Sequence, residues 1–431
     1  MAEIYITGHR NPDMDSICSA LAYADLKNLI DPANTYVPVC CSHIGESTKT
    51  LLDALDITPP RRMRNVNPKV SDVMMSPPSP LDADDPLTSY ALIVSETTPS
   101  AVPVFEGGKF YGLLSVDDVS LWAMRSLAEK GCLGTIPKIR DVMRTQGKPL
   151  QADDLFEDGK AALLGGKQRG LAVFDGEEFV GYVTRRCFLD TPRYNVILVD
   201  HNEAGQSIRG LETANVLEII DHHRLNAMKT ALPLFIDAEP LGSTCTIVYQ
   251  LFLRNGIRPS AATARILLTG IIADTLILKS PTTTQTDVES ASALAAMCRV
   301  SVEAYGRKMF SNISSLKDRD PGATIVSDFK FYTEKDLHIG IGQCEVTTLH
   351  DLGDYSAAYL EALKATAKKE SLNWALVMIT DVVAEHSVLL STPFPAEEKL
   401  PWSALSEHIF DLPGVMSRKK QLLPEIINAL S

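Results

Sequence analysis

The chain has 431 residues, a net charge of −13, and an ordinary globular composition with 45% hydrophobic and 22% charged residues. Such a length predicts about two to four domains rather than one compact core. The acidic balance argues against a protein that coats nucleic acid, because binding to a phosphate backbone needs a basic surface. It does not exclude a small phosphate substrate, since bound metal ions and a few Lys or Arg residues can form one anion site in an acidic protein.

The opening segment and the cysteines indicate where the protein works. Residues Glu3–Thr7 predict a strand at the start of the chain rather than a signal peptide. The longest apolar stretch, around Ile266–Leu278, is too short to span a bilayer and carries Asp274. Eight cysteines are scattered without CxxC pairs, which favours neither a disulfide framework nor a zinc knuckle. We therefore expect a cytoplasmic protein with no membrane partner.

The first strand ends in a loop with the sequence GHRNPDMD. A helix is expected over Ser16–Ile30, with Asp15 or Ser16 as its N-cap. His9, Asp13 and Asp15 would then lie at the carboxyl end of a strand, where ligands bind in open α/β sheets. Imidazole and carboxylate groups together suit divalent ions such as manganese, cobalt or zinc. The alternative is a plain capping loop with a turn proline.

A tandem repeat interrupts the strand–helix alternation that opens the chain. Residues Val70–Val119 match Ile139–Phe188 at a constant offset without a gap, and the matches include DVM with DVM and GLLS with GYVT. Each copy predicts an extended segment, a helix and two strands joined by a turn, which is a βαββα pattern. The pattern resembles the CBS domain, a module that works as a side-by-side pair, and the resemblance covers Val66–Asp190.

The CBS resemblance implies a binding site for adenine nucleotides. In the motif G-h-x-[ST]-x-x-D, the hydroxyl approaches a phosphate and the Asp holds the ribose. The first copy has Ser115 and Asp118, whereas the second has Thr184 and Arg185 with Cys187 in the Asp position. A thiol is a poor acceptor for ribose hydroxyls, although Arg185 can engage phosphate. The implied regulators are AMP, ADP, ATP or diadenosine polyphosphates; the alternative is a pair that only dimerises the protein.

Two further apolar strands end in Asp and His residues. One is expected over Asn195–Val199 before Asp200-His-Asn, and one over Val216–Ile220 before Asp221-His-His. Of the nine histidines in the chain, four lie at these strand ends and in the first loop. Because the carboxyl ends of parallel strands meet at one edge of a sheet, the three clusters predict one shared site. His201 and Asp221 receive no role.

An apolar helix expected over Ala261–Leu278 adds a fourth element. A carboxylate on such a helix is costly to bury unless it is paired or bound to metal, so Asp274 joins the candidate ligands. Gly270, one turn earlier, would allow close approach to a neighbour. Without the other motifs, an ion pair with Arg265 or the capping of a neighbouring element would be a credible explanation of Asp274.

The C-terminal third begins after a helix near Ser290–Met297 and a polar linker at Ser311–Pro321. Strands are expected at Leu337–Ile341 and Ala375–Ile379, and a basic run, SRKKQ, follows at Ser417–Gln421. A basic run near a terminus is often a solvated tail. Alternatively, its Arg and Lys side chains suit the oxygens of a phosphate.

Together these motifs resemble the DHH phosphoesterases, and GHRNPDMDSICSALAYA resembles their manganese-dependent pyrophosphatase branch. The resemblance implies hydrolysis of inorganic pyrophosphate by a homodimer. It implies an α/β fold with a parallel-sheet DHH domain over residues 1–65 and 191–310, a CBS pair inserted at 66–190, and a smaller α/β C-terminal domain over 320–431.

The same resemblance implies two tightly bound Mn²⁺ or Co²⁺ ions, with Mg²⁺ arriving on the substrate. One transition metal would bind His9, Asp13 and Asp200; the second would bind Asp15, His222, Asp274 and the bridging Asp200. His223 would face the substrate, and Asp13 would double as general base or acid. Arg418 and Lys419 would clamp phosphate, with Lys330 as a third, more weakly matched cation. Gly242-Ser-Thr244 resembles a family motif near the phosphate site.

Two other functions are compatible with parts of the sequence. A DHH phosphodiesterase for short oligonucleotides or cyclic dinucleotides would usually carry a GGGH-type motif, which is absent from this sequence. A non-enzymatic nucleotide sensor would not need the ligands listed above, all of which are present. Pyrophosphate hydrolysis controlled by nucleotides is therefore the favoured prediction.

Overall fold

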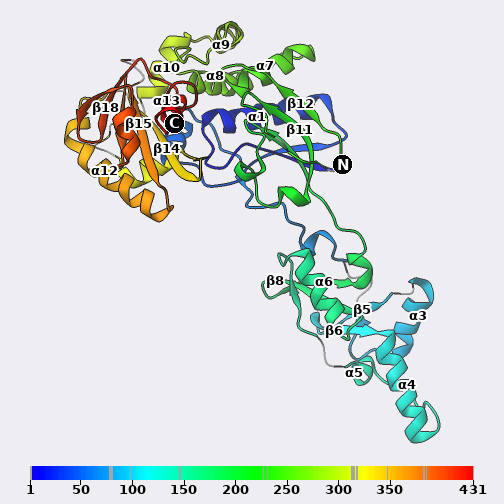
Figure 1. The fold of residues 1–431 in the computed structure, drawn as a ribbon. Helices are drawn as coiled ribbons and strands as arrows, with labels where there is room; N and C mark the ends of the chain where they lie inside the picture. The colour runs from blue at the N-terminus through cyan, green and yellow to red at the C-terminus, as the bar shows by residue number, and fades with distance from the viewer. Residues whose placement is uncertain are drawn as a thin grey trace. The chain divides into compact units, whose positions relative to one another are not determined.

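The computed structural model describes residues 2–430 except 77–80, 98, 145–146, 227, 231, 312–315, 317–318, 347, 382–383 and 385. The chain forms two compact units: a main unit of Met1–Asn65 and Asn195–Ser431, and an inserted unit of Val66–Tyr194 (Figure 1). Among the described residues, no helix is long and apolar enough to cross a membrane.

The first sheet of the main unit consists, within the described residues, of six parallel strands in the order β12-β11-β10-β1-β2-β3. β1 pairs with β10 although the whole inserted unit separates them in sequence. Residues Val196–Val199 are all buried, which explains their uninterrupted apolar run. The prediction of an α/β fold with a parallel sheet is confirmed. The strands are β1 (Glu3–Thr7), β2 (Thr35–Cys40), β3 (Arg61–Arg62), β10 (Asn195–Val199), β11 (Asn215–Asp221) and β12 (Phe235–Ala238).

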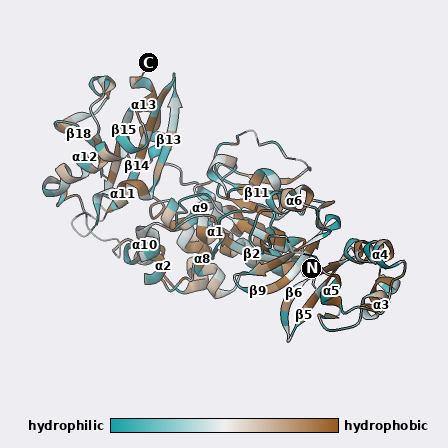
Figure 2. Cartoon of the chain, turned by 90° about the horizontal axis from the view of Figure 1, so that it is seen from below, coloured by the Kyte–Doolittle hydropathy of each residue, from teal (hydrophilic) through white to brown (hydrophobic). Residues whose placement is uncertain are grey.

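Helices cover this sheet and bury its core. α1 and α7 contact the strands, α8 packs on both of these helices, and α9 packs on α8. Apolar residues are concentrated in α1 and α8, whose side chains join one hydrophobic core with those of the sheet (Figure 2). The helices are α1 (Met14–Ile30), α2 (Glu46–Ala54), α7 (Thr244–Arg254), α8 (Ala261–Asp274), α9 (Gln285–Cys298) and α10 (Val302–Ser311).

Two predicted helix boundaries are wrong. α1 begins at Met14, and its N-cap is Asp13 rather than Asp15 or Ser16, because the Asp13 side chain accepts a hydrogen bond from the Ser16 backbone N–H at 2.9 Å. α8 ends at Asp274 instead of continuing to Leu278. Residues 276–278 have φ angles of 49°, 58° and 63°, and this left-handed turn ends the helix.

The second sheet of the main unit has, among described residues, the strand order β13-β14-β15-β16-β18-β17. The predicted strands near 337 and 375 lie in β14 and β15. Most of the predicted linker at Ser311–Pro321 lies outside the described residues. The elements are β13 (Phe329–Glu334), β14 (Leu337–Val346), β15 (Trp374–Asp381), β16 (His386–Ser391), β17 (Ser403–Ser406), β18 (Ile409–Pro413), α11 (Pro321–Ser327), α12 (Leu352–Lys369), a π-helical turn (Arg418–Leu422) and α13 (Leu423–Ala429).

The inserted unit contains two similar halves, each with a three-stranded sheet in its described part. Phe110 from one half stacks on Phe179 from the other, with ring centroids 4.3 Å apart. The final helix expected in both copies forms only in the first, because Arg185–Phe188 is a 3₁₀ turn and Pro192 follows closely. The elements are β4 (Leu81–Asp82), α3 (Leu87–Thr97), β5 (Ala101–Glu106), β6 (Lys109–Ser115), α4 (Val116–Lys130), α5 (Ile139–Val142), β7 (Leu150–Gln151), α6 (Phe156–Gly165), β8 (Gly170–Asp175) and β9 (Glu178–Thr184).

Candidate metal centre

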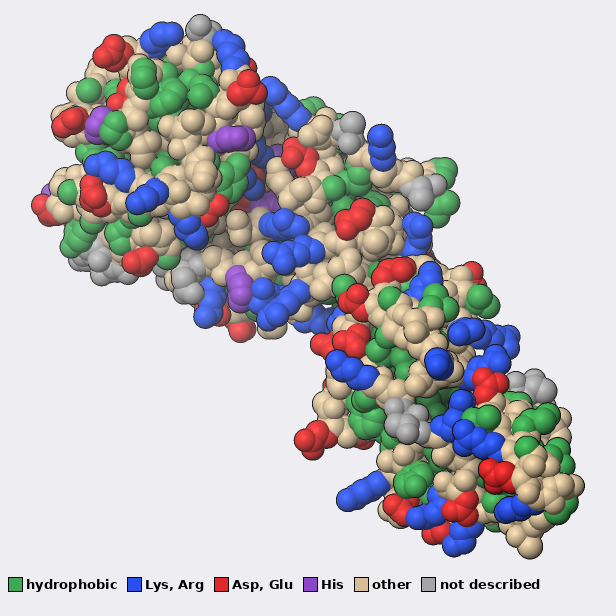
Figure 3. Space-filling model, turned by 60° about the horizontal axis from the view of Figure 1, so that its bottom comes forward, with side chains coloured by type: hydrophobic (Ala, Val, Ile, Leu, Met, Phe, Trp, Pro, Cys, Tyr) green, Lys and Arg blue, Asp and Glu red, His purple; other side chains and the backbone are tan. Residues whose placement is uncertain are grey.

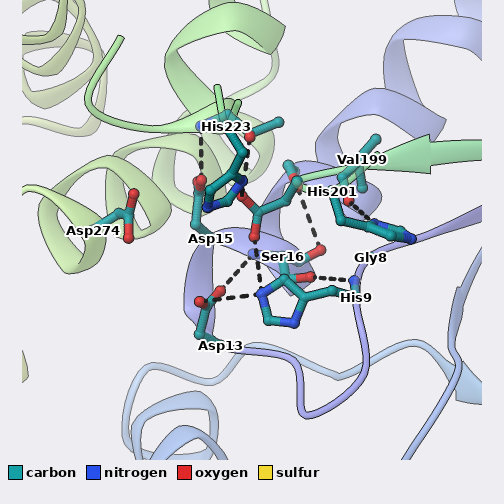
Figure 4. A network of polar contacts seen from close by, with 12 residues as sticks. Gly8, His9, Asp13, Asp15, Ser16, Val199, His201, His223 and Asp274 are labelled. Atoms are coloured by element: carbon teal, nitrogen blue, oxygen red, sulfur yellow. Dashed lines mark hydrogen bonds and ion pairs between the residues drawn. The ribbon is translucent and has the colours of Figure 1, made fainter. Parts of the chain in front are cut away.

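The loop after β1 brings His9 against two carboxylates. Nε2 of His9 lies 3.3 Å from Asp13 Oδ2 and 3.3 Å from Asp200 Oδ2. The other ring nitrogen, Nδ1, lies 2.8 Å from the carbonyl oxygen of Arg10, which fixes the ring orientation. His9 and Asp200 are buried, and Figure 4 shows His9 and Asp13 facing each other across this point.

A second cluster lies on the other side of Asp200. Nε2 of His222 is 3.5 Å from Asp200 Oδ1 and 3.4 Å from Asp274 Oδ2, while its Nδ1 lies 3.0 Å from the Leu241 carbonyl oxygen. The ligand atoms of Asp15, His222 and Asp274 lie within 4.8 Å of one another. Asp200 therefore presents Oδ2 to the first cluster and Oδ1 to the second, which is the geometry that a bridging carboxylate needs.

The backbone at Asp200 is unusual. Its φ angle is 60°, in the left-handed region that non-glycine residues rarely adopt and that occurs at functional sites. The Thr244 hydroxyl donates a hydrogen bond to Asp200 Oδ1 at 3.1 Å. The conformation turns the chain sharply at the end of β10 and leaves the Asp200 carboxylate between the two clusters.

His223 is oriented by Asp221, a residue to which the sequence assigned no role. Nδ1 of His223 lies 2.8 Å from Asp221 Oδ1, and the Asn202 amide donates to Asp221 Oδ2 at 2.5 Å. Asp221 is fully buried. Burial and His222 lower the pKa of His223 to about 4, so the ring is neutral near pH 7. With Nδ1 bonded to Asp221, Nε2 is the ring nitrogen left for a ligand.

The electrostatics of the cluster favour cations. Burial and Lys330 lower the pKa of His9, but Asp13 and Asp200 outweigh them and raise it to about 10. Burial lowers the pKa of His222, but Asp274, Asp200 and Asp15 raise it to about 9. Burial raises the pKa of Asp274 well above its usual range, and the neighbouring carboxylates add to this effect. The buried carboxylates Asp15 and Asp200 and the more exposed Asp13 and Asp274, together with two imidazoles, fit divalent ions such as Mn²⁺ or Co²⁺.

The segment Gly242-Ser-Thr244 lies directly behind the candidate ligands, at the N-terminus of α7. Ser243 Oγ donates to Asp15 Oδ1 at 2.6 Å, and the Thr244 N–H donates to Asp15 Oδ2 at 2.7 Å. The Cys245 N–H donates to Asp15 Oδ1 at 3.0 Å. A helix N-terminus suits an anion, so α7 holds the Asp15 carboxylate in place. The structure thus gives the segment a contact with a candidate metal ligand, and its place near a phosphate stays a prediction.

The predicted phosphate clamp divides into two parts. Lys330 and Lys419 are close enough to the candidate metal centre to affect its electrostatics. The charge of Lys330 lowers the pKa of His9 and Asp13, and the charge of Lys419 lowers the pKa of His223. Arg418 is buried instead against Asp328, with its guanidinium 2.9 Å from Oδ1 and 2.8 Å from the backbone carbonyl oxygen. Figure 3 shows His side chains at the base of a hollow in the main unit, with Lys and Arg side chains beside it.

The candidate nucleotide residues lie at matching positions of the two halves of the inserted unit. Asp118 Oδ2 accepts from the Ser115 N–H at 2.8 Å and from its hydroxyl, and Arg144 Nε donates to Oδ1. In the second half, the Thr184 N–H lies 3.4 Å from Cys187 Sγ. Both halves therefore use the same local arrangement, with a carboxylate in one and a thiol in the other. Arg185 follows Thr184 in the 3₁₀ turn.

Comparison with known proteins gives consistent matches. The model of the DHH family, N-terminal domain, matches residues 3–271, and that of the DHHA2 domain matches residues 307–429. The chain is 28% identical to a cobalt-dependent inorganic pyrophosphatase of Clostridium perfringens, over 99% of this chain and 98% of that protein. It is 33% identical to a manganese-dependent inorganic pyrophosphatase of Methanothrix thermoacetophila, over 56% of this chain and 78% of that protein.

A solved structure from Methanococcus jannaschii, assigned to the family II inorganic pyrophosphatases, has a similar fold. The TM-score is 0.61 at 22% identity, and the match covers 99% of each chain. At this identity the likeness bears on the fold alone.

Proposed function

The chain belongs to the DHH family, and from this premise we propose that it is an inorganic pyrophosphatase that depends on manganese or cobalt. The observation that carries the proposal is the division of the Asp200 carboxylate between two His and Asp clusters, with Lys330 and Lys419 close to them. The named activities of relatives that align over most of their length support the same substrate.

The ligands of the two ions follow from the two clusters. His9, Asp13 and Asp200 would hold one ion, and Asp15, His222, Asp274 and Asp200 would hold the other. Both imidazoles offer Nε2 while their Nδ1 atoms contact backbone carbonyl oxygens, as metal-binding histidines usually do. The donor set is nitrogen and oxygen without thiolate, which suits Mn²⁺ or Co²⁺.

When bound, such a pair of ions supplies an activated water and neutralises charge on the phosphate. The side chains of the protein would do the rest. Asp13 is half-exposed, with 48% of its side chain accessible, and would accept a proton from the attacking water. His223, held neutral with its Nδ1–H on Asp221, would accept a hydrogen bond or a proton at Nε2. Lys330 and Lys419 would neutralise phosphate oxygens that gain charge as the bridge breaks, and Mg²⁺ would arrive with the substrate.

Phosphate release tests the activity directly. Chelator-treated protein would be assayed with pyrophosphate and with a short oligonucleotide, each with Mg²⁺ alone and with added Mn²⁺ or Co²⁺. We expect rapid release from pyrophosphate only, and high activity only after transition-metal loading. Full activity in Mg²⁺ without bound transition metal, or preference for the oligonucleotide, would contradict the proposal.

We also propose that the inserted unit is a CBS pair that binds adenine nucleotides and regulates hydrolysis. Its two similar halves and the Ser115 and Asp118 pair support this assignment. AMP or ADP would inhibit, and a longer phosphate chain, as in ATP or a diadenosine polyphosphate, would activate. To test this regulation, the rate of hydrolysis would be measured against AMP and ATP concentration in wild type and in a variant lacking residues 66–190. If the nucleotides change the rate identically in the two proteins, they act elsewhere.

A homodimer working in the cytoplasm completes the proposal. The resemblance to CBS pairs, which associate face to face, motivates the dimer. Light scattering at micromolar concentration tests the dimer, and a result showing only monomer would contradict it.

A further inference from the structure

The first turn of α7 lies between two buried carboxylates. On one side, Asp15 accepts hydrogen bonds from Ser243, Thr244 and Cys245, as described above. On the other side is Asp287, from the first turn of α9, which is fully buried. A helix N-terminus offers a limited set of free N–H groups, so two carboxylates at one turn fix its position tightly.

Asp287 uses both carboxylate oxygens on this turn. Its Oδ2 accepts from the Gly242 N–H at 2.9 Å, and its Oδ1 accepts from the Thr246 hydroxyl at 2.6 Å. Oδ2 also accepts from the Thr284 N–H at 2.7 Å and from the Thr284 hydroxyl at 2.6 Å. No Lys, Arg or His in the described part of the chain forms an ion pair with Asp287. Its charge is therefore balanced by hydrogen bonds alone.

The spacing between Asp287 and the α7 turn leaves no free room. A Cβ atom on Gly242 would lie 2.8 Å from Asp287 Oδ2 and 2.8 Å from Thr275 Cγ2. Thr275 follows the candidate ligand Asp274 directly, so the same contact region also adjoins the end of α8. A shift of Asp287 would move Gly242, and with it the Ser243 and Thr244 groups that hold Asp15.

We infer that Asp287 is a positioning residue of the metal centre, acting through Gly242 and Thr246 on the α7 turn that holds Asp15. The inference rests on the proposed metal site, and it assigns Asp287 to the ion held by Asp15, His222 and Asp274. Outer hydrogen-bond partners of metal ligands typically change metal affinity by about 10- to 100-fold when they are removed.

Asp287 also caps α9, and this role must be separated from positioning. Thr284→Val removes the hydroxyl that shares in the α9 cap but leaves the bonds from Gly242 and Thr246 to Asp287. Thr246→Val removes a bond on the α7 side and leaves the α9 cap. Asp287→Asn disturbs both, because an amide nitrogen would face donor groups. The three variants are nearly isosteric changes, two at the buried Thr246 and Asp287 and one at the partly buried Thr284.

Mn²⁺ binding to the full-length, chelator-treated protein tests the inference without relying on activity. Electron paramagnetic resonance and titration calorimetry would give the dissociation constant of each of the two ions. We expect Asp287→Asn to weaken one ion by about 10- to 100-fold and to leave the other near the wild-type value. Thr246→Val should weaken the same ion to a smaller extent, and Thr284→Val should leave both unchanged even where it lowers the melting temperature.

The outcomes separate the possible failures. If Thr284→Val and Thr246→Val weaken Mn²⁺ binding equally, Asp287 acts only as a helix cap. That result would overturn the inference. Wild-type Mn²⁺ affinity in both Thr246→Val and Asp287→Asn would also overturn the inference. If Asp287→Asn does not fold, the Mn²⁺ affinity of Thr246→Val alone provides the test. Wild-type protein that binds no transition metal would instead overturn the proposed function.

Discussion

The guanidinium group of Arg418 lies 2.9 Å from the Asp328 carboxylate, and it also donates to the Asp328 and Ile341 carbonyl oxygens at 2.8 and 3.3 Å. Arg418 is only 6% exposed. The residue expected to clamp phosphate thus joins the π-helical turn to Asp328, directly before β13, and to Ile341 of β14. If Arg418 also binds phosphate as the sequence predicts, one side chain would serve both substrate binding and the stability of the C-terminal half of the main unit.

Arg418→Ala should consequently affect stability as well as substrate use. The change removes hydrogen bonds to a charged group, each worth about 1.5–3 kcal/mol, and leaves Asp328 without its cation. We expect a lower free energy of unfolding in urea and a higher KM. Lys419→Ala should raise KM with little loss of stability, because it removes an exposed side chain whose charge lies close to two other cations. Metal content should remain near wild type in both, and loss of metal in either would contradict the assignment to phosphate.

The alkaline limit of activity should depend on Lys330. Desolvation by the surrounding protein and the charges of Lys330 and Arg418 lower the pKa of Lys419, although its side chain is exposed. The protonated ammonium group is the form that binds phosphate, so activity is present below this pKa and is lost as pH rises through it. Lys330→Met removes one lowering charge, and the alkaline limb of the kcat/KM profile should move to higher pH although the maximum falls.

The exposed Lys335 provides the control for this experiment. Lys335→Met removes the same charge at a turn distant in sequence from Lys419 and should leave the limb in place. If the alkaline limb of the kcat/KM profile stays fixed or moves to lower pH in Lys330→Met, the ionisation of Lys419 does not determine that limb.

Binding of Mn²⁺ should release protons. With pKa values of about 10 and 9, His9 and His222 carry protons near pH 7 in the metal-free protein, and a metal ion must displace them. Affinity should therefore rise as pH rises from 6 to 8, with at least two protons released per pair of ions, because Asp274, whose pKa is also raised, can add to the two from the imidazoles. Calorimetry in buffers with different ionisation enthalpies measures this number. A binding enthalpy that is the same in all buffers would contradict the prediction.

The strand ends that form the centre could be predicted from sequence for a geometric reason. Parallel strands bring their carboxyl ends to one edge, so His9, Asp200 and His222 could be placed together from three short apolar runs. The α/β class followed from the same alternation of strands and helices. Asp274 could be identified as a candidate ligand only because a carboxylate on an apolar helix is costly to bury without a partner.

Contacts that depend on distant packing could not be predicted in this way. Asp15 and Thr244 are 229 residues apart in sequence, and Asp287 and Gly242 are 45 apart, yet each pair is in direct contact. Nothing in a single motif indicates that one helix N-terminus will meet both carboxylates. The pairing of Arg418 with Asp328 was missed for the same reason, since 90 residues separate them.

The asymmetry of the inserted unit leads to a gain-of-function prediction. Cys187 Sγ lies 3.4 Å from the Thr184 N–H, the position that Asp118 Oδ2 takes at 2.8 Å from the Ser115 N–H. Aspartate at 187 would thus fit the backbone as it stands. It would also restore the acceptor that ribose hydroxyls require, and hydrogen bonds to a charged group are worth about 1.5–3 kcal/mol.

Cys187→Asp should therefore tighten binding of an adenine nucleotide by about 10- to 100-fold, since each 1.36 kcal/mol corresponds to a factor of ten. Calorimetric titration of the full-length protein with AMP would detect this change, either as a second site or as a tighter single one. Cys187→Ser is the matched control, because it offers a hydroxyl of similar size without the charge. If a carboxylate is what the second half lacks, Cys187→Ser should bind AMP with wild-type affinity, whereas Cys187→Asp should bind it more tightly. Equal affinity in all three proteins would mean that the second half does not contact ribose, and that Asp118 accounts for nucleotide binding alone.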